Sequence, residues 1–316
     1  MTTTQILYLV GSLLVSTGVV LLARVLYAKL AAYDVDDQLT EADNPAIGVA
    51  LFGFIGGVTS VMLALLHTDS HGDGGADALR WDLIELTIYG LLSIFLLKAA
   101  GWINNRFITR GFENQKELVQ DRNVGVGALL GGSYLASGLI LAGALSGRAD
   151  PELIEGLGQA EIFWCEFQSA IVFFALGQIA LILFARVYQA VQTEDVLHEI
   201  ERDYEIEGRF HGGNAAAGMA FGGSLVAYSL ILFAGAHGDF EGWAHNLAIF
   251  AWAAGVGLIA LPIWRIFVDK VMLPKADLAK EIYEDRNVNA ALLESICLIA
   301  FALVILFVFP DLSTAA

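Results

Sequence analysis

Charged side chains are scarce in this chain of 316 residues, at 16% of the total, and hydrophobic residues make up 57%. A soluble domain of this length needs far more charge to cover its surface. The apolar residues also occur in runs of roughly twenty, the length that crosses the core of a bilayer. The composition therefore predicts an integral membrane protein and excludes a soluble one.

Cysteine and the motifs of enzymes are also scarce. The only cysteines, Cys165 and Cys297, are expected at different membrane depths, so we predict no disulfide and no cysteine-type metal site. The sequence has no nucleotide-binding loop, no Gly-x-Ser-x-Gly elbow and no His-Glu-x-x-His pair. We therefore expect no enzyme. The net charge of −17 excludes nucleic acid as a partner.

Eight apolar segments predict an all-α polytopic fold, because backbone groups within the bilayer need internal hydrogen-bond partners. The predicted spans are Gln5–Leu26, Pro45–Leu66, Trp81–Ile103, Val124–Leu145, Glu166–Val187, Ala215–Ala236, Ala244–Val268 and Val288–Phe309. Loops after the odd-numbered spans, with the adjoining helix ends, hold fifteen of the seventeen lysines and arginines. This bias predicts that those loops are cytoplasmic and that both termini lie on the outer side of a bacterial inner membrane.

An internal repeat divides the chain into two four-span halves, residues 1–150 and 151–316. Spans one and three match spans five and seven at an offset of 162, and span two matches span six at an offset of 170. The eight extra residues fit in the loop between spans five and six. Every even-numbered span also begins with an asparagine, at Asn44, Asn123, Asn214 and Asn287. The repeating unit is thus a two-helix hairpin present four times, and the halves are related by an axis along the membrane normal.

The repeated asparagines and glycines predict capping and close packing. An asparagine at the first turn can accept from free main-chain amides, and glycine lets a neighbouring backbone approach closely. A small residue follows four positions after each asparagine, and a glycine follows after nine positions in three of the four, at Gly53, Gly132 and Gly223. We expect the even spans to form an inner ring and the odd spans an outer, lipid-facing ring. A direct role of these residues in ligand or ion binding is the alternative.

The stretches NPAIGVALFGFIGG and NAAAGMAFGGSLVAYSLILF resemble spans of the YjfL-like bacterial inner-membrane proteins, a family that shares domain of unknown function 350. Its members are typically four-span proteins with two asparagine-led helices, so the resemblance implies a tandem duplication. It implies a helical fold and a membrane location but no activity. The most specific matches are Asn44, Gly48, Asn123, Gly127, Asn214 and Gly218. Span eight departs from the pattern, with Ala291 and Ile296 in place of glycine.

Glu294 is the one acidic residue well inside a predicted span. It lies seven positions after Asn287, roughly 10 Å along a helix. A buried acid in a membrane is costly and marks a functional site by default. A protonated acid bonded to a neighbouring helix is the alternative. Because Glu294 lies in the repeat that lacks the glycines, we expect a role acquired by that repeat.

Histidine and aspartate recur at the outer ends of spans two and six. The residues are His67, Asp69, His71, His237, Asp239 and His245. Imidazole and carboxylate together suit zinc or another divalent ion. A divalent metal ion at the outer face is therefore a possible cofactor, and a flexible turn without a ligand is the alternative.

Further polar groups are expected to have structural roles. Glu85, Glu161, Glu166 and Gln168 could line an outer vestibule or simply be solvated. Gln178 and Asn246 are expected to form interhelical hydrogen bonds. The four loops predicted to be cytoplasmic resemble short amphipathic helices on the membrane surface, which could bind a protein partner.

Two hypotheses of function follow. The first is a channel or transporter for protons or small ions, favoured by Glu294 and by outer segments with 13 acidic and 2 basic residues, which would concentrate cations. The second is a membrane scaffold that recruits envelope-stress or signalling partners through its cytoplasmic helices. In either case the lipid bilayer is the first partner, and a homo-oligomer is possible.

Overall fold

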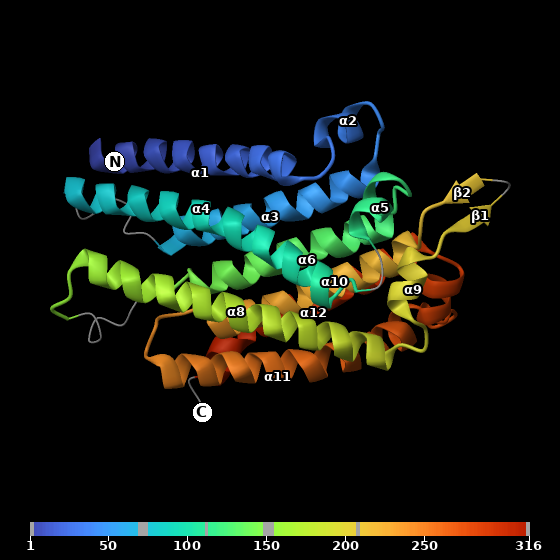
Figure 1. Cartoon of the computed structure of the whole chain (residues 1–316). Coiled ribbons are helices and arrows are strands. Elements are labelled where there is room, and N and C mark those ends of the chain that lie inside the picture. The colour runs from blue at the N-terminus through green and yellow to red at the C-terminus, as the bar shows by residue number, and fades with distance from the viewer. Residues whose placement is uncertain (1–2, 69–74, 111–112, 148–154, 207–208, 314–316) are drawn as a thin grey trace.

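The computed structural model describes residues 3–68, 75–110, 113–147, 155–206 and 209–313. Within these ranges, eight helices are long and apolar enough to cross a membrane (Figure 1). They are α1 (Thr3–Leu30), α3 (Pro45–Thr68), α4 (Gly75–Phe107), α6 (Val124–Ala144), α8 (Gln159–Val191), α10 (Ala215–Ala236), α11 (Trp243–Phe267) and α12 (Val288–Ser313). The predicted all-α membrane fold with eight spans is confirmed.

Four short elements lie at one end of the bundle, each just before an even-numbered span (Figure 1). They are α2 (Val35–Thr40), α5 (Asn114–Val119), α9 (Val196–Glu201) and the π-helix η2 (Lys280–Glu284); a second π-helix, η1 (Val268–Met272), extends α11. We call this end the asparagine end. The sequence predicts helices lying on the membrane surface, but their apolar side chains, such as Val35, Ile200 and Ile282, are buried among the ends of the spans.

The loop between spans five and six differs from the other three. After α9 it forms an antiparallel hairpin of β1 (Tyr204–Ile206) and β2 (Arg209–His211), in which Tyr204 lies opposite His211. The hairpin projects from the asparagine end (Figure 1). The sequence predicts a helix here, but the alternation of Tyr204, Glu205 and Ile206 has the two-residue period of a strand. The extra residues of the second half are thus accommodated in this hairpin.

The even-numbered spans form an open row in the order α3, α6, α10, α12 (Figure 1). Each of these helices packs along the next, and within the described ranges α3 and α12 share no comparable interface. The predicted inner ring is therefore wrong. In a ring, α12 would also pack against α3. Instead, α6 and α10 each present small residues on two opposite faces, so that successive helices line up in a row.

The odd-numbered spans form a second layer against this row. α4 packs against both α3 and α6, α8 against both α6 and α10, and α11 against both α10 and α12. α1 packs against α3 and α4. Each odd helix except α1 therefore bridges two neighbouring even helices. The prediction of an outer ring is wrong in the same way, because the odd spans form a layer rather than a closed ring.

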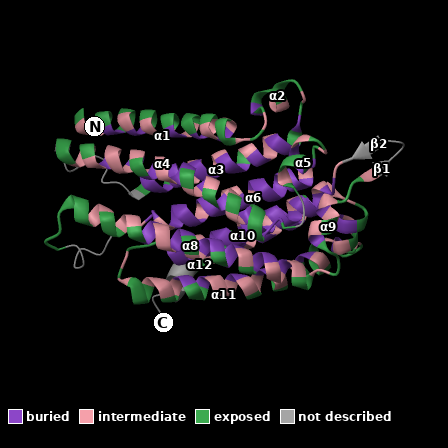
Figure 2. Ribbon diagram, viewed as in Figure 1, coloured by how far each residue is buried: buried purple, intermediate pink, exposed green. Residues whose placement is uncertain are grey.

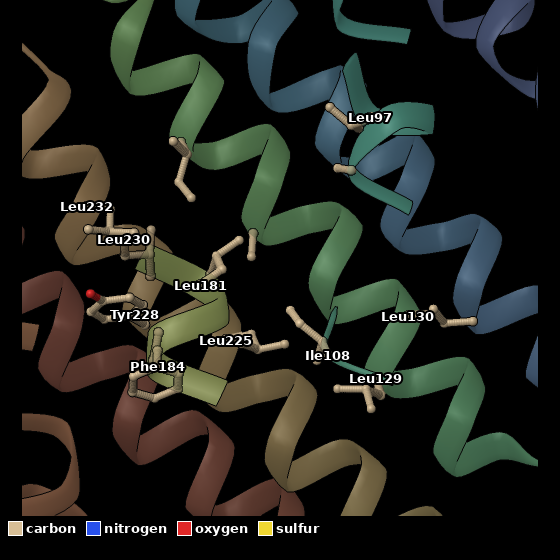
Figure 3. Close-up of a cluster of buried hydrophobic side chains, with 14 of the residues drawn as sticks. Leu97, Ile108, Leu129, Leu130, Leu181, Phe184, Leu225, Tyr228, Leu230 and Leu232 are labelled. Carbon is tan, nitrogen blue, oxygen red and sulfur yellow. The ribbon is translucent and has the colours of Figure 1, made fainter. Parts of the chain in front are cut away.

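Burial is greatest in the middle of the row, at α6 and α10 (Figure 2). Aromatic and leucine side chains fill the space between the two layers. Figure 3 shows Leu181 and Phe184 of α8 beside Leu225 and Tyr228 of α10. The rings of Phe184 and Tyr228 stack with their centroids 4.5 Å apart. Thr3 and Ser313 both lie towards the end of the bundle away from the short elements (Figure 1), which we call the histidine end.

Candidate functional site

The four repeated asparagines cap the helices that they precede. Asn123 has an extended backbone, and its Oδ1 accepts from the main-chain N–H of Val126 at 3.1 Å. In the same way, the Oδ1 atoms of Asn44, Asn214 and Asn287 accept from the main-chain N–H groups of Ala46, Ala217 and Asn289, respectively. Each bond satisfies a main-chain donor that the first turn of a helix leaves free.

The side-chain amides of three asparagines also join neighbouring hairpins. Asn123 Nδ2 donates to the carbonyl oxygen of Ile200, in the short helix of the next hairpin, at 2.8 Å. The equivalent bonds run from Asn44 to the Leu118 carbonyl at 2.8 Å and from Asn214 to the Ile282 carbonyl at 2.9 Å. Sequence reasoning missed these bonds, because a main-chain acceptor leaves no signal in the residue type. Three hairpins are thereby each bonded to their successor.

A second bond fixes the asparagine amide within its own hairpin. Asn123 Nδ2 donates to Glu117 Oε2 at 2.8 Å, and Asn287 Nδ2 donates to Glu281 Oε2 at 2.7 Å. In the first hairpin the acceptor is Gln38 Oε1 at 2.8 Å. Each acceptor precedes its asparagine by six positions, a spacing that sequence reasoning missed.

Replacing Asn123 with alanine is expected to lower the free energy of unfolding by about 2–3 kcal/mol. The buried side chain caps α6, and its loss leaves the buried Ile200 carbonyl without this donor. Asn287→Ala is the matched control, because Asn287 donates within its own hairpin; we expect a loss of about 1 kcal/mol there. Equilibrium unfolding in mixed micelles measures both. Equal losses would contradict the role of the bond between hairpins.

Burial raises the pKa of Glu117 above its ordinary value of 4.5, although the bond from Asn123 opposes the shift. A carboxyl whose folded-state pKa is raised binds more protons when folded than when unfolded. Its contribution to stability is therefore present below about 4.5 and is lost as pH rises through the raised pKa.

Glu117→Gln is expected to remove this dependence, because glutamine is neutral and Gln38 already fills the equivalent place. Thermal unfolding across a pH series should show a melting temperature that falls with rising pH above 4.5 in the wild type and falls less in the variant. Parallel curves for the two proteins would refute the prediction.

The glycines of the even helices lie where two main chains approach. A Cβ added to Gly132 of α6 would lie 2.6 Å from the Cα of Gly222 in α10. Added methyl groups at Gly53, Gly127 and Gly218 would overlap main-chain atoms of the neighbouring helix, and one at Gly223 would overlap Ser295. Gly48 is different, because its nearest neighbour would be a Leu39 side-chain atom at 3.8 Å. All of these glycines except Gly48 therefore allow neighbouring helices to pack closely.

Glu294 forms an ion pair within the packed helices. Its Oε1 accepts from Arg265 Nε of α11 at 2.8 Å, and the Glu294 side chain is 0% exposed against 16% for Arg265. The second oxygen of the carboxylate and Nη2 of the guanidinium have no partner among the described residues. Nearby, the hydroxyls of Tyr188 and Tyr283 lie 3.4 Å apart. Sequence reasoning counted Arg265 only as an orientation signal, because nothing in the repeat marks it as a partner.

In the first half of the chain, Lys98 lies against aromatic rings, whereas Arg265 in the second half is paired with a carboxylate. Lys98 of α4 places its ammonium 4.8 Å from the ring centroid of Tyr27 and 5.7 Å from that of Phe54. Tyr134 of α6 packs edge-on against Phe54. This cation–π arrangement was also missed from the sequence. The two halves therefore differ in the charged side chains that lie between their helices.

His67, His237 and His245 lie at the histidine end. His237 Nδ1 bonds to Ser146 Oγ, and burial, then the nearby His67, lowers the pKa of His237, whereas Asp239 raises it. His245 pairs with Glu241 at 3.3 Å. Asp69 and His71 lie outside the described residues. Within the ranges that the structure covers, no three His, Cys, Asp or Glu side chains gather as metal ligands would. A divalent metal site at this end stays a prediction.

The remaining polar candidates have local roles. Gln178 Nε2 donates to Ser137 Oγ at 3.2 Å and so joins α8 to α6, as expected. Asn246 was expected to join two helices, but it bonds to main-chain atoms of Asp239 and Glu241 in the preceding loop. Glu161 accepts from the main-chain N–H of Gly158 at the start of α8. Glu85, Glu166 and Gln168 lie on α4 and α8 near the histidine end.

The fold and these contacts define an integral membrane protein built from four copies of one helical hairpin. The chain belongs to the family described as Domain of Unknown Function (DUF350), which matches residues 1–145 and again residues 161–309. The two matches confirm the predicted tandem duplication. No curated protein and no solved structure matches the chain.

Proposed function

We propose that the protein moves protons or small cations across the membrane, and that Glu294 and Arg265 form the charged site on which this movement depends. The observation that carries the proposal is the burial of Glu294 among membrane-spanning helices at 0% exposure. Ionisable groups inside a membrane are expensive, and by default they indicate a functional site.

The comparison among the repeats supports a functional role for this carboxylate. The residues that occupy the same place, seven positions after the asparagine, are Leu51, Leu130 and Phe221 in the other three even helices. The row therefore packs without a carboxylate there. In addition, Glu294 Oε2 and Arg265 Nη2 have no partner among the described residues, so the pair retains the capacity to bind a proton, a water molecule or a cation.

Proton or cation flux into proteoliposomes tests the proposal. The wild type should give flux above that of protein-free liposomes, and Glu294→Gln should abolish it, because the amide is neutral and cannot exchange a proton. Glu41→Gln is the matched control, since Glu41 is an exposed carboxylate at the asparagine end; we expect wild-type flux from it. Wild-type protein that gives no flux at any pH or voltage would refute the proposal.

The β1–β2 hairpin favours a second candidate, a scaffold that binds a protein partner. The hairpin projects from the asparagine end, and the described residues of the other three repeats form no equivalent strands. Scrambling residues 203–208 should then abolish recovery of a specific partner in a pull-down while the eight spans stay folded. Unchanged recovery of that partner would show that the hairpin does not bind it.

A further inference from the structure

Two consecutive positions in each even helix face opposite neighbours in the row. In α6, Gly131 lies eight positions after the asparagine, and a Cβ there would lie 2.6 Å from the Val49 carbonyl oxygen of α3. The next residue, Gly132, faces α10 instead. In α10 the same two positions, Gly222 and Gly223, face α6 and α12 respectively. The eighth position therefore faces the preceding helix, and the ninth faces the following one.

Large residues occupy these positions only at the two edges of the row. In α3 the eighth position is Phe52, which is 73% exposed, whereas the ninth is Gly53. In α12 the ninth position is Ile296, which is 58% exposed, whereas the eighth is Ser295. Each large side chain thus lies on the face that has no neighbouring helix among the described residues.

The same positions would meet if a second copy extended the row. Each internal interface pairs the ninth position of one helix with the eighth position of the next, in the small pairs Gly53–Gly131, Gly132–Gly222 and Gly223–Ser295. A second copy placed in the same way would bring Ile296 of one chain against Phe52 of the other. Two large side chains cannot occupy a space in which two glycine main chains touch.

We propose that Phe52 and Ile296 end the row by excluding a second copy of this chain from both edges, and that lipid acyl chains cover these edges. The polar residues His67 and Asn289 are exposed at the ends of α3 and α12. The other large side chains exposed along both edges support lipid as the occupant, because they are apolar. They are Leu63 on α3 and Leu292, Leu303, Val304, Phe307 and Val308 on α12.

Gly48 provides independent support from the α3 edge. It occupies the fourth position, where Gly127 and Gly218 each touch the preceding helix. A Cβ on Gly48 would meet only the Leu39 side chain, at 3.8 Å. Among the residues that the structure describes, no main chain therefore lies close to this edge from Gly48 to Phe52.

Cysteine crosslinking tests the exclusion. Gly143 lies against Phe233 across the α6–α10 interface, and the equivalent edge residues are Phe307 on α12 and Leu63 on α3. Leu63→Cys and Phe307→Cys are introduced into a chain that carries Cys165→Ser and Cys297→Ala. In proteoliposomes under oxidation we expect this chain to stay monomeric. Adding Phe52→Gly and Ile296→Gly should increase crosslinked dimers and longer products at least tenfold.

The control replaces Phe52 and Ile296 with leucine, which keeps the bulk and should leave the chain monomeric. Alanine at both positions should give an intermediate yield, and all variants should fold because both side chains are exposed. A bimane label on Leu63→Cys should be quenched by brominated lipids as strongly as one on Phe95→Cys, an exposed position on α4. The proposal would be overturned if the chain with native Phe52 and Ile296 formed crosslinked dimers, or if the glycine and alanine variants gave no more dimer than that chain. It would also be overturned if brominated lipids did not quench the label on Leu63→Cys.

Discussion

Glu294→Leu is expected to lower the free energy of unfolding by about 3–5 kcal/mol, because it leaves the Arg265 guanidinium buried without its counter-charge. Arg265→Leu should have a similar effect for the converse reason. The carboxylate is fully buried and the arginine side chain is only 16% exposed, so water screens the pair little. Steric trapping or unfolding in mixed micelles would measure both losses.

The double variant Glu294→Leu with Arg265→Leu is expected to recover most of this stability. Replacing a buried ion pair with apolar side chains is often nearly neutral, and leucine already occupies the equivalent of position 294 in α3 and α6. The double variant also separates function from folding, since it should be folded but without flux. Losses that simply add in the double variant would show that the two side chains do not stabilise each other.

Gly127→Ala is expected to lower the free energy of unfolding by about 1–3 kcal/mol or more, although alanine is the better helix former. The added methyl group would overlap the Ala46 carbonyl of α3, and both helices would have to move apart. α6 lies in the middle of the row, so the displacement would also disturb its contact with α10.

Gly48→Ala is the matched control at the same motif position. Its methyl group would make ordinary contact with Leu39 at 3.8 Å, and the helix propensity of alanine should leave stability unchanged or raise it by up to about 1 kcal/mol. Because both variants make the same glycine-to-alanine change, any difference between their unfolding free energies reflects the surroundings of the two positions. A loss at Gly48 as large as that at Gly127 would mean that the α3 edge is covered by a helix.

The spans, the duplication and the caps could be predicted because they depend on local sequence. A run of apolar residues, an offset between similar segments and an asparagine before a first turn each leave a signal in consecutive residues. The bond from Asn123 to Ile200 could not be predicted, since any residue type supplies a carbonyl. Arg265 was likewise missed, because its partner Glu294 lies on another helix.

The predicted ring is wrong because glycine spacing shows only part of how helices pack. Glycine spacing indicates that helices approach closely, but it does not indicate how many do so or whether the set closes. The missing glycine of span eight suggested an acquired function around Glu294. The structure instead places Ile296 on the exposed face of α12, away from α10. The loss of glycine at position 296 therefore concerns the edge of the row, whereas Ala291 is fully buried. Glu294 must be judged on its own contacts.

The bonds from each asparagine to the following hairpin have a consequence for biogenesis. Leu118, Ile200 and Ile282 all lie downstream of the asparagines that bind them. During synthesis each of the first three hairpins therefore enters the bilayer with one amide donor still awaiting its acceptor, which arrives with the next pair of helices. Because contacts run mainly between neighbours in sequence, assembly can proceed by successive addition from the N-terminal hairpin, as in repeat proteins.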